Sequence, residues 1–191
     1  MALAKTGITE ATPKNIVFGA GTIYRDLKFE TSKFTGTIIG ATQGGSKFTI
    51  TPEITDIEAD GALVKTKGLT VKTGETATME VNFLEVTPEI LEMTSLGKEN
   101  SSSSATGFTE IISKANIEVG DYVAGLAFVG RTLDGREIIV LFDNALCTSG
   151  LELEGKNKEN GVVKATFECY ADLTGDLETL PYHIYYSIVT G

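Results

Sequence analysis

Strict alternation of apolar and polar side chains is the feature that most constrains the fold of this chain. In residues 163–172 the apolar positions Val163, Ala165 and Phe167 alternate with polar ones, and residues 77–83 repeat the pattern. Successive side chains of a β-strand point to opposite faces, so a period of two marks strands with one buried and one wet face. Such strands are typical of antiparallel sheets, and the sequence therefore predicts a mainly β fold.

Further strands and turns follow from the same kind of pattern. The other expected strands are residues 15–18, 22–25, 47–57, 69–72, 108–114, 122–131, 137–142 and 182–189. A switch of the apolar face near residues 52–56 predicts a β-bulge, and the apolar run 138–142 predicts the most buried strand. We expect turns at residues 73–75 and 133–136, the second of the primed hairpin type, and a long loop over residues 28–45.

The segment VTPEILEMTSLG predicts the one convincing helix of the chain. Thr87 is suited to cap its amino end, and Pro88 to occupy its first helical position. Glu89 favours the helix dipole, and Gly97 ends the helix. A helix this short, with Ile90 as an apolar contact, suits a flanking position on a sheet. The expected fold class is therefore an antiparallel β-sandwich or half-barrel with one short flanking α-helix.

The length of 191 residues favours a single domain over residues 1–191. Residues 1–14 have little periodicity, which predicts a flexible amino-terminal arm. Residues 97–106, GKENSSSSAT, have the composition of a linker. Because the sheet of the amino half needs a second layer to cover it, we expect a flexible loop within one domain at this place.

The acidic composition argues against several classes of function. The formal net charge is −10, which disfavours attraction to the phosphates of nucleic acid. The sequence starts without an apolar leader and holds no apolar run near the ~20 residues of a membrane helix, so we expect synthesis in the cytosol and no membrane association. Cys147 and Cys169 lie in apolar β-patterned stretches, which favours free core thiols over a disulfide.

The motifs that could carry chemistry are each incomplete. Residues 40–47, GATQGGSK, have the glycine spacing of a phosphate-binding loop, but they end in Ser-Lys and precede a strand instead of a helix. His183, the single histidine, has no acid, cysteine or serine at a motif spacing, which indicates a packing or interface role. Acidic pairs such as Glu58 with Asp60 lack the spacing of a calcium loop. The sequence therefore predicts no catalytic residue, no cofactor and no metal site.

The last expected strand carries more apolar surface than a terminal edge strand needs. One of its faces holds Tyr182, Ile184, Tyr186 and Ile188, and the other face holds Tyr185. An open strand edge is a template for pairing with another chain, so such edges are normally short, charged or covered. We expect another surface to cover this strand.

Several segments, taken in order, resemble the major tail tube proteins of long-tailed, non-contractile bacteriophages. They are GAGTIYRD, GTIIGATQGG, KFTITPEITDIEADGALVKTKGL, MEVNFLEV and TPEILEMT, followed by a second β half. The resemblance covers most of the chain, from about Asn15 onward, and its motifs are a loose arrangement of glycines, acidic turns and one helix. It implies a structural virion protein that is made in the host cytoplasm and located in the phage tail.

The resemblance also implies how copies assemble. Proteins of this family form hexameric rings, and the stacked rings conduct DNA from the capsid to the host cell. In such a ring each sheet continues into the next copy, so a large inter-subunit β-barrel leaves no edge unpaired. The implied partners are further copies of the chain, tape measure, tail terminator and tail-tip proteins, and DNA in transient passage without binding.

Two sets of residues follow as candidate sites. We expect a loop over residues 29–46 and the amino-terminal arm to make the ring-to-ring contacts. The residues expected at the subunit or ring interface, in that loop and in the last strand, are Gly40, Gly44, Gly45, Tyr182, Ile184, Tyr186 and Ile188. Those expected on the lumen, where carboxylates repel a passing phosphate backbone, are Glu53, Glu80, Glu168 and Asp172. Lys164 shares the parity of Glu168, so a mixed, ordinary solvated face stays open as the alternative.

Two other classes of protein stay open as well, and a hydrolase is a third, because paired carboxylates that converge in space leave no spacing in the sequence. A tube subunit of a contractile injection or type VI secretion-like machine resembles a tail tube protein in fold, and long tubes formed with tail-tip proteins would separate the two. A monomeric β-sandwich binding module would need no self-association. An export signal and an exposed aromatic cluster would favour that module, and the sequence shows neither clearly.

Overall fold

The architecture comes from a computed structural model that describes residues 6–101, 104–155 and 157–188. Three predicted segments lie partly outside the described residues. The residues concerned are 1–5 of the amino-terminal arm, 102–103 of the flexible loop and 189 of the last strand. The fold is mainly β and antiparallel with one α-helix, as predicted. The flexibility predicted for residues 1–14 and 97–106 stays a prediction.

The described residues form eleven strands, one α-helix and two 3-10 turns. In chain order they are η1 (Thr12–Asn15), β1 (Thr22–Glu30), β2 (Lys33–Gly40), β3 (Thr42–Asp56), β4 (Thr70–Phe83), α1 (Pro88–Ser95), β5 (Lys98–Glu99), β6 (Ile111–Ile112), η2 (Val119–Asp121), β7 (Val123–Arg131), β8 (Glu137–Cys147), β9 (Glu152–Glu154), β10 (Val162–Cys169) and β11 (Tyr182–Tyr186). Strands β5 and β6 pair with each other, and the other nine form a single sheet.

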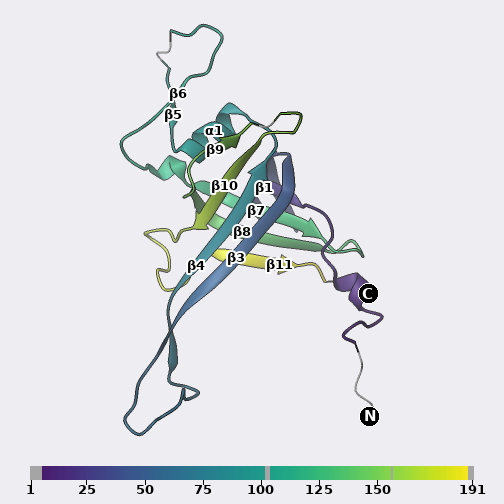
Figure 1. The fold of residues 1–191 in the computed structure, drawn as a ribbon, viewed down its shortest axis with the longest axis vertical. Coiled ribbons are helices and arrows are strands. Elements are labelled where there is room, and N and C mark those ends of the chain that lie inside the picture. Colours follow the sequence, from purple (N-terminus) through teal and green to yellow (C-terminus); the bar gives the residue numbers. More distant parts are fainter. Residues whose placement is uncertain (1–5, 102–103, 156, 189–191) are drawn as a thin grey trace.

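This nine-stranded sheet branches at β8. Its main path runs β2-β1-β7-β8-β10-β4-β3, with β9 on β10 and β11 on β8, and every pairing is antiparallel. Residues 138–142 of β8 pair with β11, and residues 145–147 pair with β10 on the same side of the strand. We call β2-β1-β7-β8-β11 the first branch and β3-β4-β10-β9 the second branch. In Figure 1 the strands β3, β4 and β10 run obliquely across β7, β8 and β11.

The main core lies between the two branches. Its largest side chains are the fully buried Phe83, Phe142 and Phe167 of β4, β8 and β10. The rings of Phe83 and Phe167 meet edge to face, with centroids 6.4 Å apart. The alternation predicted for β10 and the burial predicted for residues 138–142 are confirmed, with only Ile138 left half-buried. Both cysteines lie in this core as free thiols, as predicted.

A second, smaller apolar cluster lies on the opposite face of the first branch. It consists of Leu27, Ala127, Ile139 and Leu141, with Tyr24, Phe34 and Val129 packed against it. The register of β1 shifts at Asp26, whose φ of 53° is left-handed, and the β1–β2 hairpin turns over this face. Phe34 thereby reaches Tyr185 of β11, with ring centroids 5.0 Å apart. Gly125 permits the close approach, since a Cβ there would lie 2.6 Å from the Leu27 nitrogen.

The long loop predicted over residues 28–45 is wrong. These residues form the end of β1, all of β2 and the start of β3. The segment is rich in Thr, Ser and Gly, and its strand β2 forms because β1 supplies backbone partners. Gly36 also fits against Leu27, where a Cβ would lie 2.9 Å from a methyl carbon. Two predicted strands are shorter than expected: residues 15–18 contribute one bridge, and residues 108–114 contribute only β6.

Strand β4 is continuous, which contradicts the turn predicted at residues 73–75. It pairs with β3 from one end to the other, and the turn of this hairpin lies beyond it. The register does shift between Glu53 and Ile54, where a bulge was predicted, but the extra residue is Thr73 of β4. Gly74 serves this irregularity, since a Cβ there would lie 2.7 Å from a carboxylate oxygen of Glu53.

The tight turn between β7 and β8 is not of the predicted primed type. Gly135 has a φ of 86°, whereas Leu133 and Asp134 keep negative φ values. The Gly135 nitrogen donates to the Thr132 carbonyl at 2.9 Å. This is a type I turn followed by a left-handed glycine, the usual form of a three-residue hairpin loop.

Helix α1 begins as predicted and is fastened to the first branch. Its threonine cap accepts a hydrogen bond from the Ile90 nitrogen at 3.2 Å. Ile90 is fully buried in the main core, and Glu89 pairs with Arg25 of β1 at 2.5 Å. The left-handed residue that ends the helix is Leu96, with a φ of 51°, one position before the predicted Gly97.

Candidate functional site

The outward face of the second branch brings three of the predicted acidic residues together. Register places Glu80 of β4 opposite Thr166 of β10, with Glu168 two residues further along the same face. Glu53 lies on this face of β3, two steps of alternation beyond Thr49. We call this the polar face, which consists of Lys47, Thr49, Thr51, Glu53, Thr76, Thr78, Glu80, Asn82, Lys164, Thr166 and Glu168.

The polar face is mixed in charge. The ammonium of Lys47 lies 2.8 Å from Glu80. That of Lys164 lies 2.8 Å from Glu152 and 3.6 Å from Glu154, both on β9. Hydrogen bonding to Glu152 raises the pKa of Lys164. Each lysine of the polar face is thus paired with a carboxylate, and the lumen position of these acids stays a prediction.

Asp172, the fourth predicted lumen residue, lies off the polar face. It follows β10 and accepts hydrogen bonds from the backbone nitrogen and hydroxyl of Thr174, at 2.9 and 2.8 Å. These two bonds lower the pKa of Asp172. Its carboxylate stabilises a local turn, a role that Asp176 repeats a few residues later with Glu178 and Thr179.

Strand β11 holds three of the predicted interface residues, and Ile188 follows it. Tyr182 is half-buried against Phe48 of β3, with ring centroids 6.5 Å apart. Ile184 and Tyr186 are 52% and 44% exposed, and Ile188 is 79% exposed. In the part of the chain that the structure describes, β11 pairs only with β8. The interface role of these residues stays a prediction.

The three predicted interface glycines do not form a flexible docking loop. Gly44 and Gly45 lie inside β3, where the register shifts by two residues between Thr42 and Ser46 and both glycines have φ near 85°. They form a bulge in an edge strand. Gly40 ends β2 against helix α1, where a Cβ would lie 3.5 Å from a methyl carbon of the buried helix isoleucine.

A hairpin that exposes apolar side chains projects from the sandwich, a form that the sequence did not predict. Beyond Glu53, β3 and β4 continue away from the sandwich and end in a loop over residues 57–69 (Figure 1). We call residues 54–71 the arm. Its apolar side chains face solvent, with exposures of 62% for Ile54, 97% for Leu63 and 78% for Val64. Neither apolar cluster contains a residue of the arm.

The base of the arm is ordered by a small polar network. Asp56 accepts hydrogen bonds from Lys65 at 2.6 Å and from Thr70 at 2.8 Å, and these lower its pKa. The Ile57 nitrogen donates to the Leu69 carbonyl at 2.6 Å. The apolar tip is therefore held away from the body by a closed base.

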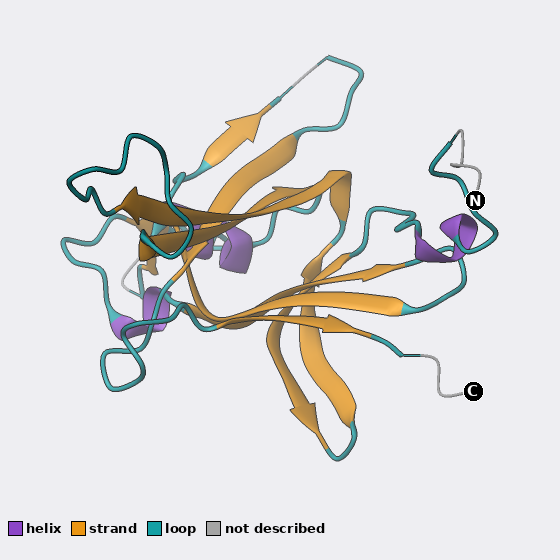
Figure 2. Ribbon diagram, turned by 90° about the horizontal axis from the view of Figure 1, so that it is seen from below, coloured by secondary structure: helices purple, strands orange, loops and turns teal. Residues whose placement is uncertain are grey.

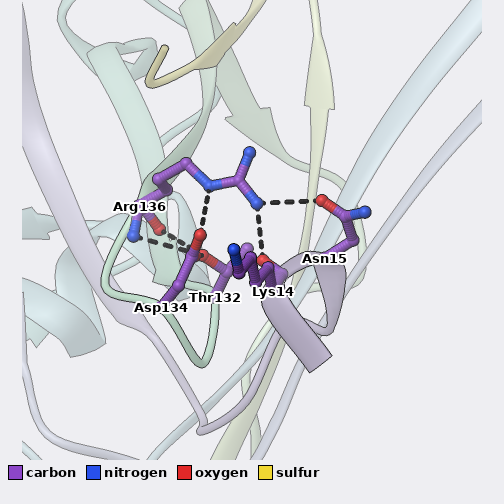
Figure 3. Close-up of polar contacts among 5 residues, drawn as sticks. All are labelled: Lys14, Asn15, Thr132, Asp134 and Arg136. Carbon is purple, nitrogen blue, oxygen red and sulfur yellow. Dashed lines mark hydrogen bonds and ion pairs between the residues drawn. The ribbon is translucent and has the colours of Figure 1, made fainter. Parts of the chain in front are cut away.

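A second feature without a sequence signal is the cluster around Arg136 in the β7–β8 turn (Figure 3). Its guanidinium donates to Asp134 at 2.8 Å, to the Lys14 carbonyl at 2.6 Å and to Asn15 at 2.8 Å. The same group lies 5.0 Å from the ring centroid of Tyr186. It fastens η1 beside the end of β11, and both lie at the same side of the molecule in Figure 2.

The structure defines the surroundings of His183 and Cys169. His183 lies 3.4 Å from Asp143 and stacks on Tyr185, and its side chain is exposed, so the predicted packing or interface role stays a prediction. Burial, with smaller contributions from Asp143 and Glu168, raises the pKa of Cys169 to about 12, which keeps it a thiol. Within the described ranges no three His, Cys, Asp or Glu side chains are placed to hold a metal ion. No helix among them is long and apolar enough to cross a membrane.

Comparison with known proteins gives weak structural similarity and no match of sequence. No protein-family model matches the sequence, and no curated protein matches it. The fold is similar to a chain in the structure "Virion of native gene transfer agent (GTA) particle", with a TM-score of 0.41 and 10% identity. The match covers 88% of this chain and 96% of that one. A TM-score of 0.41 is too low to bear on function.

Proposed function

We propose that this chain is a structural virion protein whose copies form hexameric rings that stack into a phage tail tube. The observation that carries the proposal is the arm, an ordered hairpin that projects from the sandwich and exposes an apolar tip. Clustered apolar side chains at the end of such an element favour a protein partner. Residues 29–46 form strands and the turns between them instead of the docking loop that was expected to make the ring-to-ring contacts. We therefore assign these contacts to the arm, residues 54–71.

The arm has the character of a docking element. Its base is closed by Asp56, so the tip is already shaped before a partner arrives, and little ordering entropy opposes binding. Leu63 and Val64 supply the apolar area. Because the arm adds nothing to the core, a change at its tip should alter assembly and leave the fold intact.

The polar face suits a surface along which DNA slides. Its threonines and glutamates offer phosphates no unpaired cation, since Lys47 and Lys164 are both held by carboxylates. Six copies multiply a formal net charge of −10, which repels a polyanion. We therefore propose Glu53, Glu80 and Glu168 for the lumen, and a role that involves no bond-making chemistry.

The proposed setting is the tail of a virion. The protein would be made in the host cytoplasm and would contact tape measure, tail terminator and tail-tip proteins at the ends and in the bore of the tube. Long tubes formed with tail-tip proteins would separate this function from that of an injection-machine tube. A lone monomer at every concentration would instead favour a binding module.

Electron microscopy of the purified protein at rising concentration tests the proposal. We expect rings and stacked rings from the natural sequence. The double substitution Leu63→Asp with Val64→Asp should give a folded protein that forms rings without stacks. A matched control, Phe108→Asp, alters a side chain that is 78% exposed on another loop and should stack normally. A natural protein that stays monomeric in the presence of tail-tip proteins would overturn the proposal.

A further inference from the structure

Four strands of the large sheet have one side without a partner strand in the described residues: β2, β3, β9 and β11. An open side presents unpaired N–H and C=O groups that can pair with another chain. Proteins usually protect such sides with charges, prolines or bulges. The protection that each strand carries therefore indicates which sides are available for pairing.

Strands β3 and β9 are protected. β3 carries Lys47, Pro52 and Glu53, together with the glycine bulge near its start. Pro52 lacks an N–H, and the bulge interrupts the regular spacing that a second strand would need. β9 is only three residues long, and two of them are Glu152 and Glu154.

Strands β11 and β2 lack prolines and carry little charge, although the register of β2 against β1 shifts at Ile39. β11 has the sequence YHIYY, with no proline, acid, lysine or bulge. β2 has one charged residue, Lys33, at its hairpin end, and residues 34–40 carry none. These two strands are the opposite edges of the first branch. The two uncharged open sides of the molecule thus belong to one continuous run of strands.

The hydrogen-bond pattern shows which backbone groups of β11 face outward. The Ser187 nitrogen donates to the Glu137 carbonyl at 2.9 Å, and the Asp143 nitrogen donates to the Pro181 carbonyl at 3.0 Å. Bonding alternates along an antiparallel pair, so the odd-numbered residues of β11 bond to β8. The N–H and C=O groups of Ile184 and Tyr186 therefore point to the open side.

We infer that the open side of β11 in one copy pairs with the open side of β2 in a second copy. The inference rests on the proposed function, because it requires that copies associate. Four successive antiparallel pairings separate β2 from β11, so the two strands run in the same direction. Rotation about a ring axis preserves that direction, and the new pair is parallel. Two different edges make a heterologous contact, which closes when the rotations complete a ring.

The side chains at the two edges are compatible with this pairing. Register across the first branch runs through Ile38, Tyr24, Ala127, Leu141 and His183, which puts these residues on one face. Ile38 is 56% exposed, and Tyr185, next on this face of β11, is 38% exposed. Pairing of the two edges continues this face across the contact and covers apolar side chains on both copies.

Proline substitution in β11 tests the inference. Ile184→Pro removes an outward N–H that is not bonded to β8, so the monomer should keep a melting temperature close to that of the natural protein. Ring formation, followed by sedimentation and electron microscopy, should need a concentration about tenfold higher or more. Tyr185→Pro is the matched comparison, since it removes an inward N–H and should lower the melting temperature. Ile184→Lys is a second variant that keeps the backbone and places a charge at the edge.

The outcomes separate this inference from the proposed function. Rings from both Ile184→Pro and Ile184→Lys at the natural concentration would overturn the β11 contact and leave the tube function standing. A natural protein that never associates would overturn both. Rings that form without stacks, as expected of the arm variant, would leave the β11 contact intact.

Cross-linking identifies the partner edge. Copies with Ile38→Cys and copies with Tyr185→Cys place thiols on the same face of the two edges, and their mixture should form disulfide-linked dimers under oxidation. Either variant alone should form few. Efficient linkage of Tyr185→Cys to itself would show β11 against β11 and would overturn the assignment of β2.

Discussion

The outward faces of the two branches differ in how much apolar surface and unpaired backbone they leave exposed. On the polar face of the second branch, both lysines are paired with carboxylates and the threonines are wholly or partly exposed. On the first branch, the small cluster under the β1–β2 hairpin leaves Phe29 59% and Tyr185 38% exposed, and both edges of that branch are uncharged. The polar face of the second branch needs no partner to cover it. The first branch, in contrast, exposes apolar side chains and unpaired backbone groups that a neighbour could cover.

The largest expected effect on stability is at β8, which pairs with strands of both branches. Phe142→Ala removes a fully buried ring from the main core and should lower the free energy of unfolding by about 3–5 kcal/mol, measured by urea denaturation. Phe18→Ala is the control, since Phe18 is 73% exposed, and it should change stability by less than about 0.5 kcal/mol. Similar losses for the two variants would show that β8 does not hold the branches together.

A smaller effect is expected in the second cluster. Leu27→Ala should lower the free energy of unfolding by about 2–3 kcal/mol, near the low end for buried leucine, because half-buried side chains surround it. The same urea titration measures it. A loss near zero would mean that the hairpin does not pack on the first branch, and a loss as large as that of Phe142→Ala would merge the two clusters into one core.

The Arg136 cluster should contribute less again. Arg136→Met removes hydrogen bonds to Lys14 and Asn15 and should cost about 1–2 kcal/mol. Limited proteolysis should then cut faster around residues 14–19, with fragments identified by mass spectrometry. Arg131→Met, which loses only an exposed pair with Glu137, is the control. Unchanged cleavage in Arg136→Met would contradict the fastening of η1.

The same cluster makes a prediction about pH. Hydrogen bonds from Thr132 and then Arg136 hold the pKa of Asp134 below its usual 3.8, although burial opposes them. A depressed folded pKa contributes stability above the unfolded value and loses it as the pH decreases through the folded value. The natural protein should therefore melt at a higher temperature than Asp134→Asn at pH 6, and the difference should shrink as the pH decreases below 3.8. A difference that persists at pH 2 would assign the effect to geometry instead of charge.

The smallest effect is expected on the polar face. Lys47→Gln breaks an exposed ion pair with Glu80 and should change the free energy of unfolding by less than about 0.5 kcal/mol. Thermal unfolding at low and high salt measures it, with Lys98→Gln as control. A loss above 1 kcal/mol would show that the stability of the second branch depends on the charge pairs of the polar face as well as on strand pairing.

Much of the fold could be predicted from sequence where burial is one-sided. The alternation around Phe167, the apolar run of β8 and the cap of α1 are local patterns that the packing preserves. Strand β2 could not be predicted, because its Thr and Gly residues become a strand only against β1. The turn expected at residues 73–75 failed for a similar reason: pairing with β3 overrides the turn preference of Gly74.

The candidate site was less accessible to sequence. Alternation along each strand placed Glu80 and Glu168 on the polar sides of their strands. The apolar character of Ile184 indicated that another surface covers its strand. The pairing of Lys164 with Glu152 depends on the register of β9 with β10, and Arg136 meets Lys14 across a separation of 122 residues. The glycines and acidic turns of residues 36–68 indicated a surface that pairs with other surfaces, but the projection of Leu63 and Val64 depends on the length of the β3–β4 pairing, which the local pattern does not give.

The branching of the sheet at β8 sets the order in which the protein can fold. The β3–β4 hairpin is local and can form early, yet Met79 and Phe83 stay uncovered until β10, far later in the chain, pairs with β4. Topologies dominated by such distant pairings fold in milliseconds to seconds. During synthesis the apolar side of this hairpin therefore stays exposed until β8 and β10 emerge, and exposed apolar surface of this kind favours aggregation.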